Sequence, residues 1–328
     1  MWARPVAVLT HGLRVRTIDA RVFPLRRLYA LPLPHNQVLH LGGRPLVMGI
    51  LNVTPDSFGE SSHLVAGGSV DFARAVDAAL RMEAEGADMV DIGGESTRPG
   101  ADPVPSAEEA SRVVPIIRAL GGRLRIPISV DTYKADVARA AVAEGASIVN
   151  DISGLLYDPE LARVVAETGA ALVLMHTRGW SKTMYVEAEY GDVIAEVVAE
   201  LRDRVACATR AGVLADRLIV DPGVGFAKRP AHSYGVLAGL AELALALDRP
   251  VLVGTSRKSF LRDAVADRPA PERDWGTAAA VAAAVLGGAH IVRVHAVAEM
   301  VQVVRVAEEI RRHSQDAPGS KTREGQRQ

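Results

Sequence analysis

The sequence has little cysteine, little aromatic content and almost no net charge. Its single cysteine, Cys207, excludes an intramolecular disulfide and a cysteine-rich metal site, and it favours a reducing, cytoplasmic location. Aromatic residues make up 4% of the 328 residues, so any interior must be built from aliphatic side chains. The formal charge of −1 lacks the basic excess of a general nucleic-acid binder. No apolar run reaches the roughly 18 residues that a membrane-spanning helix requires. We therefore expect a cytoplasmic protein that binds neither nucleic acid nor membrane.

The two ends of the chain differ from its middle. Residues 1–43 carry six arginines but a single acidic residue, Asp19, which is typical of an organelle transit peptide. However, residues 13–23 alternate apolar and charged side chains with the two-residue period of a strand. We favour a folded N-terminal extension over residues 1–43, a short hairpin or edge strand, and keep a cleaved segment as the alternative. Residues 313–328 have no apolar periodicity and are expected to form a disordered tail.

Between these ends, residues 44–312 repeat one pattern, in which short apolar runs alternate with alanine-rich amphipathic stretches of helical length. The pattern predicts strands at 46–52, 87–93, 126–131, 146–151, 171–176, 217–221, 250–254 and 290–295. Strand–helix alternation with short connections implies parallel strands and right-handed crossovers. Eight such units over about 250 residues match an α/β fold of the (β/α)8 TIM-barrel type. A doubly wound open sheet is the alternative, but "LNVTPDSFG" is not the glycine-rich turn that usually follows its first strand.

Polar or charged residues follow all eight predicted strands. They are Asn52 with Asp56, Glu95 to Arg98, Asp131 with Thr132, Asn150 with Asp151, His176, Asp221, Ser256 to Lys258, and Arg293 with His295. The carboxyl ends of barrel strands meet on one face, where the active sites of such barrels lie. An Asp or Asn at such a position can simply cap the next helix. Cations cannot accept bonds from helix amides, so capping does not explain Arg98, Lys258 or Arg293.

These residues separate by chemistry into three groups. The carboxylate and amide groups of Asp131, Asn150 and Asp221 suit a flat, nitrogen-rich ring. Lys258 could contact a carbonyl or nitrogen of that ring, and Phe226 could pack against its face.

The second and third groups suit phosphate and a metal ion. Arg98, Arg293 and His295 form an anion-receiving set that suits phosphate. Asn52 and Asp56 offer oxygens to a hard cation, for which Mg²⁺ is the expected ion. A heterocycle pocket beside an anion pocket and a place for Mg²⁺ suggests the displacement of pyrophosphate.

Eight motifs occur in a fixed order along this part of the chain. They are "MGILNVTPDSF", "DIGGESTRPGA", "ISVDTYKADVARAA", "NDISGL", "MHTRG…KTM", "DPGVGF", "VGTSRKSF" and "RVH". In order and spacing they resemble the motifs of the dihydropteroate synthase family, over about residues 44 to 312. The resemblance implies a (β/α)8 barrel and a homodimer. It also implies a transferase that condenses 6-hydroxymethyl-7,8-dihydropterin pyrophosphate with p-aminobenzoate, giving dihydropteroate and pyrophosphate in folate biosynthesis.

The resemblance further implies a role for each matching residue. The pterin ring would be bound by Asp131, Asn150, Met175, Asp221, Phe226 and Lys258. The p-aminobenzoate side and its loops would comprise Asp56, Phe58, Thr97, Arg98, Pro99 and Ser256. The pyrophosphate would be bound by Asn52, Arg293 and His295, with Asn52 as the Mg²⁺ ligand. Catalysis is expected from Asp131, Lys258, Arg293 and His295.

The sequence departs from the family pattern in several places. The first loop reads "DSFGESSHLVAGG" where "DSFSDGG" is usual, and Ala296 replaces the aspartate that usually follows His295. Ala227 replaces a glycine, and Trp180 is bulky for its turn. Two alternatives therefore stay open. One is a catalytically impaired pterin-binding paralogue, and the other is a pterin-dependent methyltransferase-like barrel.

Overall fold

The computed structural model describes residues 23–54, 65–66, 69–96, 102–180, 183–186 and 188–315. At its centre lie eight strands in the order β10-β9-β8-β7-β6-β3-β12-β11, and every pairing between neighbours is parallel. Their bounds are β3 (Leu46–Asn52), β6 (Met89–Gly93), β7 (Ile128–Asp131), β8 (Ile148–Asp151), β9 (Ala171–Met175), β10 (Leu218–Asp221), β11 (Leu252–Gly254) and β12 (Ile291–Val294). Each lies within one of the eight predicted ranges, so the predicted strands are confirmed.

The two outer strands of this sheet meet and close it. Val220 forms a parallel bridge with Val251, and its backbone N–H donates to the carbonyl of Pro250 at 3.0 Å. The sheet is therefore the predicted (β/α)8 barrel, and the open-sheet alternative is excluded. A further two-residue antiparallel pair, β4 (Val65–Ala66) and β5 (Ser69–Val70), follows β3.

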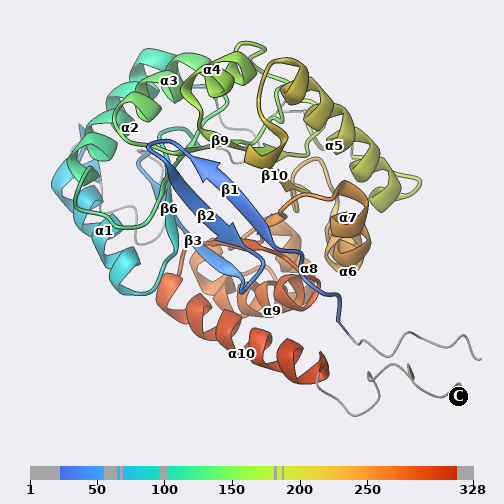
Figure 1. Ribbon diagram of the computed structural model, residues 1–328. Coiled ribbons are helices and arrows are strands. Elements are labelled where there is room, and N and C mark those ends of the chain that lie inside the picture. Colours follow the sequence, from blue (N-terminus) through green and yellow to red (C-terminus); the bar gives the residue numbers. More distant parts are fainter. Residues whose placement is uncertain are drawn as a thin grey trace, which may run out of the picture.

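Helices surround the barrel (Figure 1). They are α1 (Phe72–Ala84), α2 (Ser106–Leu120), α3 (Ala135–Ala143), α4 (Leu161–Thr168), α5 (Val193–Arg210), α6 (Pro230–Ala238), α7 (Leu240–Leu247), α8 (Arg262–Val265), α9 (Asp274–Leu286) and α10 (Val297–Gln315). Side-chain caps fix two of their starts, because Asp71 accepts from the N–H of Arg74 and Asp192 accepts from those of Ile194 and Ala195. Gly169 ends α4 in the left-handed conformation, with φ 72°. Among the described residues, no helix is long and apolar enough to cross a membrane.

Aliphatic side chains fill the interior of the barrel toward the amino-terminal ends of its strands. These buried residues are Leu46, Met48, Met89, Ile148, Ala171, Val173, Ile219, Leu252 and Ile291. Two further apolar clusters lie between the strands and the surrounding helices. This layered packing leaves the polar chemistry to the opposite, carboxyl-terminal ends of the strands.

A hairpin covers the amino-terminal end of the barrel (Figure 1). It pairs β1 (Tyr29–Leu33) with β2 (Gln37–Leu41) in antiparallel register. The turn has His35 at φ 59° and Asn36 at φ 58°, the positive values that a tight type I′ hairpin turn requires. Leu31, Leu33 and Leu41 are buried against the apolar residues at this end of the barrel. The hairpin is thus part of the same core.

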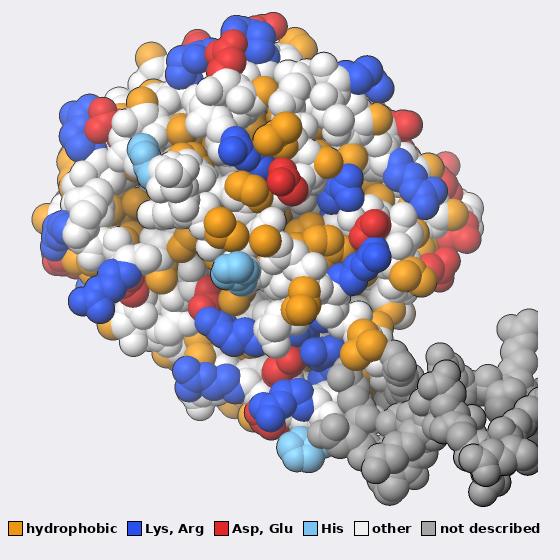
Figure 2. Space-filling model, viewed as in Figure 1, with side chains coloured by type: hydrophobic (Ala, Val, Ile, Leu, Met, Phe, Trp, Pro, Cys, Tyr) orange, Lys and Arg blue, Asp and Glu red, His pale blue; other side chains and the backbone are white. Residues whose placement is uncertain are grey.

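The segment before the hairpin is also anchored to the barrel. Arg26 is buried, donates from Nε to the carbonyl of Ala289 at 2.8 Å and forms an ion pair with Glu308 on α10. Figure 2 shows this end of the molecule, where basic and acidic side chains alternate with apolar ones. The strand predicted over residues 13–23 lies outside the described residues except for its last residue. The helix α10 continues to Gln315, past residue 312, where the barrel was predicted to end.

Candidate active site

A buried charge network crosses the barrel at Arg293. This side chain, on β12, donates from Nε to Asp91 Oδ2 on β6 and from a terminal nitrogen to Asp131 Oδ2 on β7, both at 2.6 Å. Asn150, on β8, donates from Nδ2 to the same oxygen of Asp91 at 2.9 Å. Burial alone would lower the pKa of Arg293, but the two carboxylates outweigh it and raise that pKa above its ordinary value. Arg293 is therefore a permanent cation that holds two carboxylates in place.

Asp131 accepts one hydrogen bond in this network, from Arg293, whereas Asp91 accepts two. The Oδ1 of Asp131, like that of Asp91, is buried and has no hydrogen-bond partner within the described part of the chain. Burial raises the pKa of Asp131 to about 7, with Arg293 opposing the rise and Asp91 adding to it. Buried polar atoms normally have partners, so an unpaired carboxylate oxygen at the end of a barrel strand is a candidate to accept a hydrogen bond from a ligand.

Asp221 ends β10 and begins a tight turn. Its Oδ1 accepts from the N–H of Gly223 at 2.7 Å. Gly223 has φ +66°, and a Cβ there would lie 1.9 Å from the carbonyl oxygen of His176, so this turn requires glycine. The same Cβ would lie 3.4 Å from Cγ of Met175, a buried residue at the end of β9. Burial raises the pKa of Asp221, and Lys258 opposes that rise.

Lys258 reaches the same turn from the loop after β11. Its Nζ donates to the carbonyl of Val224 at 2.6 Å and lies 4.5 Å from the ring centroid of Phe226. Burial lowers the pKa of Lys258 to about 8, although Asp221 favours the charged form. The predicted pterin-side residues Asp221, Phe226 and Lys258 are therefore brought together by one loop.

Ser256 and His295 are adjacent, although the resemblance assigns them to different subsites. The Oγ of Ser256 lies 2.8 Å from Nδ1 of His295 and also accepts from the backbone N–H of His295 at 3.2 Å. The loop after β11 is thus joined to the end of β12. A group bound at His295 would lie next to one bound at Ser256.

Asn52 ends β3 beside a space that a glycine leaves open. A Cβ on Gly93 would lie 3.6 Å from Asn52 Oδ1 and 3.5 Å from Asp131 Oδ2. Asn52 therefore offers one side-chain oxygen beside this space, and Mg²⁺ usually binds through one or two protein oxygens together with phosphate. Of the residues described, no three or more His, Cys, Asp or Glu form a group that could hold a metal ion.

Comparison with known proteins identifies the family that has this arrangement. The family described as "Pterin binding enzyme" matches residues 48–295. The chain is 46% identical over 279 residues to "Dihydropteroate synthase" of Synechocystis sp., which covers 84% of this chain and 94% of that protein. The chain belongs to the dihydropteroate synthase family.

Solved structures of this family have the same fold. A Xanthomonas albilineans dihydropteroate synthase with 4-aminobenzoic acid aligns with a TM-score of 0.76 and 42% identity, covering 84% of this chain and 96% of that one. The complex of a synthase from that organism with 7,8-dihydropteroate aligns with a TM-score of 0.72 and 40% identity, covering 82% and 94% of the two chains.

Some residues that the family resemblance singles out lie outside the described residues. They are Asp56, Phe58, Thr97, Arg98 and Pro99. Glu95, which lies just before residues 97–101, is described and has several partners. It pairs with Lys134, accepts from the hydroxyl of Tyr133 at 2.8 Å and accepts from the N–H of Val104 at 2.9 Å. Lys134 also donates to the carbonyl of Val104 at 2.6 Å, so one lysine joins the two flanks of the segment.

Three polar strand ends contact other parts of the protein, and for Asp151 the partners are backbone N–H groups, as the capping interpretation allows. Asp151 accepts from the N–H groups of Ser153 at 2.8 Å and Leu155 at 2.6 Å. Arg257 forms two hydrogen bonds, both at 2.8 Å, with the carboxylate of Asp274.

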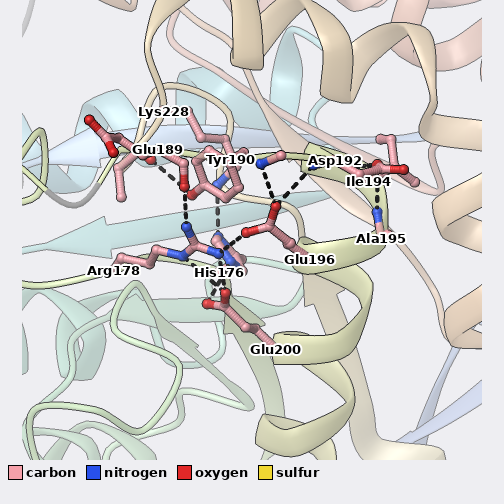
Figure 3. A network of polar contacts seen from close by, with 12 residues as sticks. His176, Arg178, Glu189, Tyr190, Asp192, Ile194, Ala195, Glu196, Glu200 and Lys228 are labelled. Carbon is pink, nitrogen blue, oxygen red and sulfur yellow. Dashed lines mark hydrogen bonds and ion pairs between the residues drawn. The ribbon is translucent and has the colours of Figure 1, made fainter.

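The third such end is His176, whose Nε2 lies 3.1 Å from Glu200 Oε2 on α5 (Figure 3). These contacts place His176 in a network behind the turn at Gly223.

Among the buried charges that sequence reasoning missed, two lie at the candidate site. Asp91 is fully buried yet lies within "MVDIG", whose pattern predicts only an apolar strand. A carboxylate inside such a run was the available signal, because a charge is rarely buried without a partner. Lys228 is 1% exposed and follows the "DPGVGF" motif. It has no comparable signal, because a lysine in a loop is usually solvated.

Proposed function

We propose that this chain is a transferase that condenses 6-hydroxymethyl-7,8-dihydropterin pyrophosphate with p-aminobenzoate. The products are dihydropteroate and pyrophosphate, and the reaction belongs to folate biosynthesis. Membership of the dihydropteroate synthase family supports this assignment over 84% of the chain. The substrates are small molecules, in agreement with the ligands named for the two related structures.

The observation that carries the proposal is the unpaired carboxylate oxygen of Asp131. Asn150, Asp221 and Lys258 lie on or directly after other strands of the same barrel and present an amide, a carboxylate and an ammonium. A flat ring that carries both N–H donors and a carbonyl could pair with all four groups at once. A pterin has this pattern, whereas an aliphatic substrate does not.

The transfer breaks the bond between the pterin methylene carbon and a pyrophosphate oxygen, and it forms a bond from that carbon to the arylamine nitrogen. The pyrophosphate leaves with the bonding electron pair, so positive charge develops on the pterin. Asp131, ionised above about pH 7, places negative charge beside that ring. The arylamine then supplies its electron pair and loses a proton. The displacement is SN1-like and needs no covalent intermediate with the enzyme.

Arg293 contributes by holding Asp131. Its two bonds, to Asp91 and Asp131, fix the carboxylate without removing its second oxygen from the site. Positioned charge stabilises a transition state better than charge that must reorganise. The roles of Arg293 and His295 at the departing pyrophosphate remain predictions, as does that of Ser256 at the p-aminobenzoate.

We also propose Mg²⁺ as the cofactor. Asn52 Oδ1, together with oxygens of the substrate pyrophosphate, would hold the ion beside the open space at Gly93. A bound Mg²⁺ would neutralise charge on the leaving pyrophosphate.

A homodimer is part of the proposal, and α9 supports it. Trp275 is 88% exposed, and Ala279 and Ala283 follow it at four-residue spacing on the exposed face of the same helix. Val306 and Ile310, on the adjacent helix α10, are also exposed. Trp275→Glu is expected to shift the sedimentation coefficient toward that of a monomer. We place the enzyme in the cytoplasm, which the single unpaired Cys207 favours.

The test is pyrophosphate release by the purified chain with Mg²⁺ and both substrates. Release should require the pterin pyrophosphate and p-aminobenzoate together. Asp131→Asn should lower kcat/KM by about 100-fold, the scale of losing one preorganised electrostatic group. Asp136→Asn removes an exposed carboxylate nearby and serves as the control.

Two results would contradict the proposal. Tight binding of the pterin pyrophosphate without release would identify a catalytically impaired paralogue, with the first loop and Ala296 as the first places to look. Methyl transfer from a pterin without pyrophosphate release would identify the methyltransferase-like alternative.

A further inference from the structure

Lys228 is a buried cation that the proposed reaction does not use. It is 1% exposed and lies in the loop between β10 and α6. Its Nζ lies 2.7 Å from Nδ1 of His176 and donates to the carbonyl of Phe226 at 3.2 Å. A buried ammonium is costly unless its protons are paired, so these contacts are the reason it can be accommodated.

The partner His176 is fixed from its other side. Its Nε2 lies 3.1 Å from Glu200 Oε2 on α5. A charged Lys228 can only donate, so Nδ1 is then the acceptor, and the ring is the neutral form whose Nε2–H donates to Glu200. Glu200 also accepts from Nε of Arg178 at 2.9 Å, and the guanidinium of Arg178 lies 4.0 Å from the ring centroid of Tyr190 (Figure 3). The network therefore joins the end of β9, the helix α5 and the loop after β10.

The loop that Lys228 holds is the wall of the proposed pterin site. Residues 222–228 contain Val224, whose carbonyl accepts from Lys258, and Phe226, whose ring lies beside that same lysine. The hydroxyl of Tyr190 donates to the carbonyl of Ala227 at 2.9 Å, next to the carbonyl that Lys228 holds. A displacement of this loop would move the aromatic wall and the partner of Lys258 together.

We propose that Lys228 is a positioning residue for the pterin side of the reaction, acting through His176 and the Phe226 carbonyl to fix residues 222–228. The inference rests on the proposed function, because it assumes that this loop faces the pterin. It assigns to Lys228 no contact with substrate. Loss of the lysine should therefore impair the use of the pterin pyrophosphate and spare that of p-aminobenzoate.

The charges around Lys228 provide a second way to test its role, through the pKa of His176. It is surrounded by Asp221 on β10 and Glu200 on α5, which favour its charged form, and by Lys258 and Arg178, which oppose it. Burial lowers the pKa of Lys228 to about 7. Burial also lowers the pKa of His176 to about 4, and the charge of Lys228 adds to that effect. Removing the lysine should therefore raise the pKa of His176.

The experiment compares Lys228→Met with Arg229→Met, which removes an exposed cation from the next position. Lys228→Met is expected to raise KM for the pterin pyrophosphate by about tenfold, the scale of one lost charge-assisted hydrogen bond, and to leave KM for p-aminobenzoate within about twofold. Arg229→Met should change neither. Lys228→Gln keeps a donor without the charge, so it should recover part of the loss if bracing of the loop is the role.

Histidine NMR measures the pKa of His176, which general destabilisation of the protein would not change. In the wild type the His176 ring should stay neutral to about pH 4, and in Lys228→Met its pKa should rise. Equal losses for both substrates, or an unchanged KM for the pterin pyrophosphate in folded Lys228→Met, would overturn the inference. If the wild type released no pyrophosphate, the proposed function would fail separately. Calorimetric binding of the pterin pyrophosphate to the same variants would then test the inference, with equal affinities overturning it.

Discussion

Replacing Asp91 by asparagine removes one charge from the buried network at Arg293 and leaves its shape almost unchanged. The oxygen of asparagine can still accept from Arg293 and Asn150, which contact Asp91 Oδ2 at 2.6 Å and 2.9 Å. The bond to Arg293, however, changes from one between two charges to one with a neutral amide. A bond to a charged group is worth about 1.5–3 kcal/mol, and the variant keeps the charge of Arg293 but loses that of Asp91, so we expect a loss of about half that value, about 1–1.5 kcal/mol.

This loss should appear in the rate because Arg293 also holds Asp131. About 1.4 kcal/mol corresponds to a tenfold change, so kcat/KM of Asp91→Asn should fall by about tenfold. The pH dependence should move as well. Burial raises the pKa of Asp131 to about 7 and Asp91 adds to that rise, so Asp131 is protonated below about pH 7 and ionised above it. In wild type kcat/KM should increase as pH rises through about 7, and in Asp91→Asn this limb should lie at lower pH.

Steady-state pyrophosphate release from about pH 5 to pH 9 measures both effects. Asp77→Asn, which neutralises an exposed carboxylate on α1, is the matched control. Thermal unfolding establishes that both variants are folded. A folded Asp91→Asn enzyme whose kcat/KM stays within twofold of wild type, with its acid limb unmoved, would refute the role given to this network.

Four further outcomes are expected. Leu31→Ala, which leaves a cavity under the hairpin, should lower the free energy of unfolding by about 2–5 kcal/mol in a denaturant titration and leave both KM values unchanged. Lys134→Met should cost about 3–5 kcal/mol in the same titration, because the buried carboxylate of Glu109 would lose the cation that it pairs with; a loss below about 1 kcal/mol would contradict this. Ala227→Gly should add about 1 kcal/mol, since Ala227 has φ 46°, and a decrease would show that this conformation is not strained. Burial lowers the pKa of Lys258 to about 8, so kcat/KM should fall as pH rises through about 8 and the lysine loses its proton; Lys258→Met should lack this limb.

The barrel could be predicted because its strands are short, buried and parallel. Such strands appear as apolar runs, and their spacing and order determine where they lie in the barrel. The polar residues that follow them, such as Asn150 and Asp221, could be predicted for the same reason. The contacts among these side chains could not, because they join strands far apart in the sequence. Asp91 and Arg293 are separated by 202 positions.

Local sequence pattern alone does not separate neighbouring residues with similar chemistry. Arg257 and Lys258 adjoin, but Arg257 has φ 59° and pairs with Asp274, whereas Lys258 reaches the turn at Val224. The two side chains differ in direction, and Arg257 has a positive φ, about which hydrophobic alternation and composition carry no information. A hairpin is expected within residues 1–43 from the alternation at 13–23, and the structure has one over residues 29–41.

The hairpin over the amino-terminal end also affects how ligands enter and leave the barrel. With Leu31, Leu33 and Leu41 packed into that end, ligands are expected to exchange through the carboxyl-terminal mouth. Two substrates and two products would then share one opening. A substrate bound deep among the strand ends has to enter before one bound nearer the mouth, and the joined product cannot leave past an occupied outer site. A single-entrance barrel of this kind therefore favours an ordered sequence of binding and release, set by depth rather than by affinity.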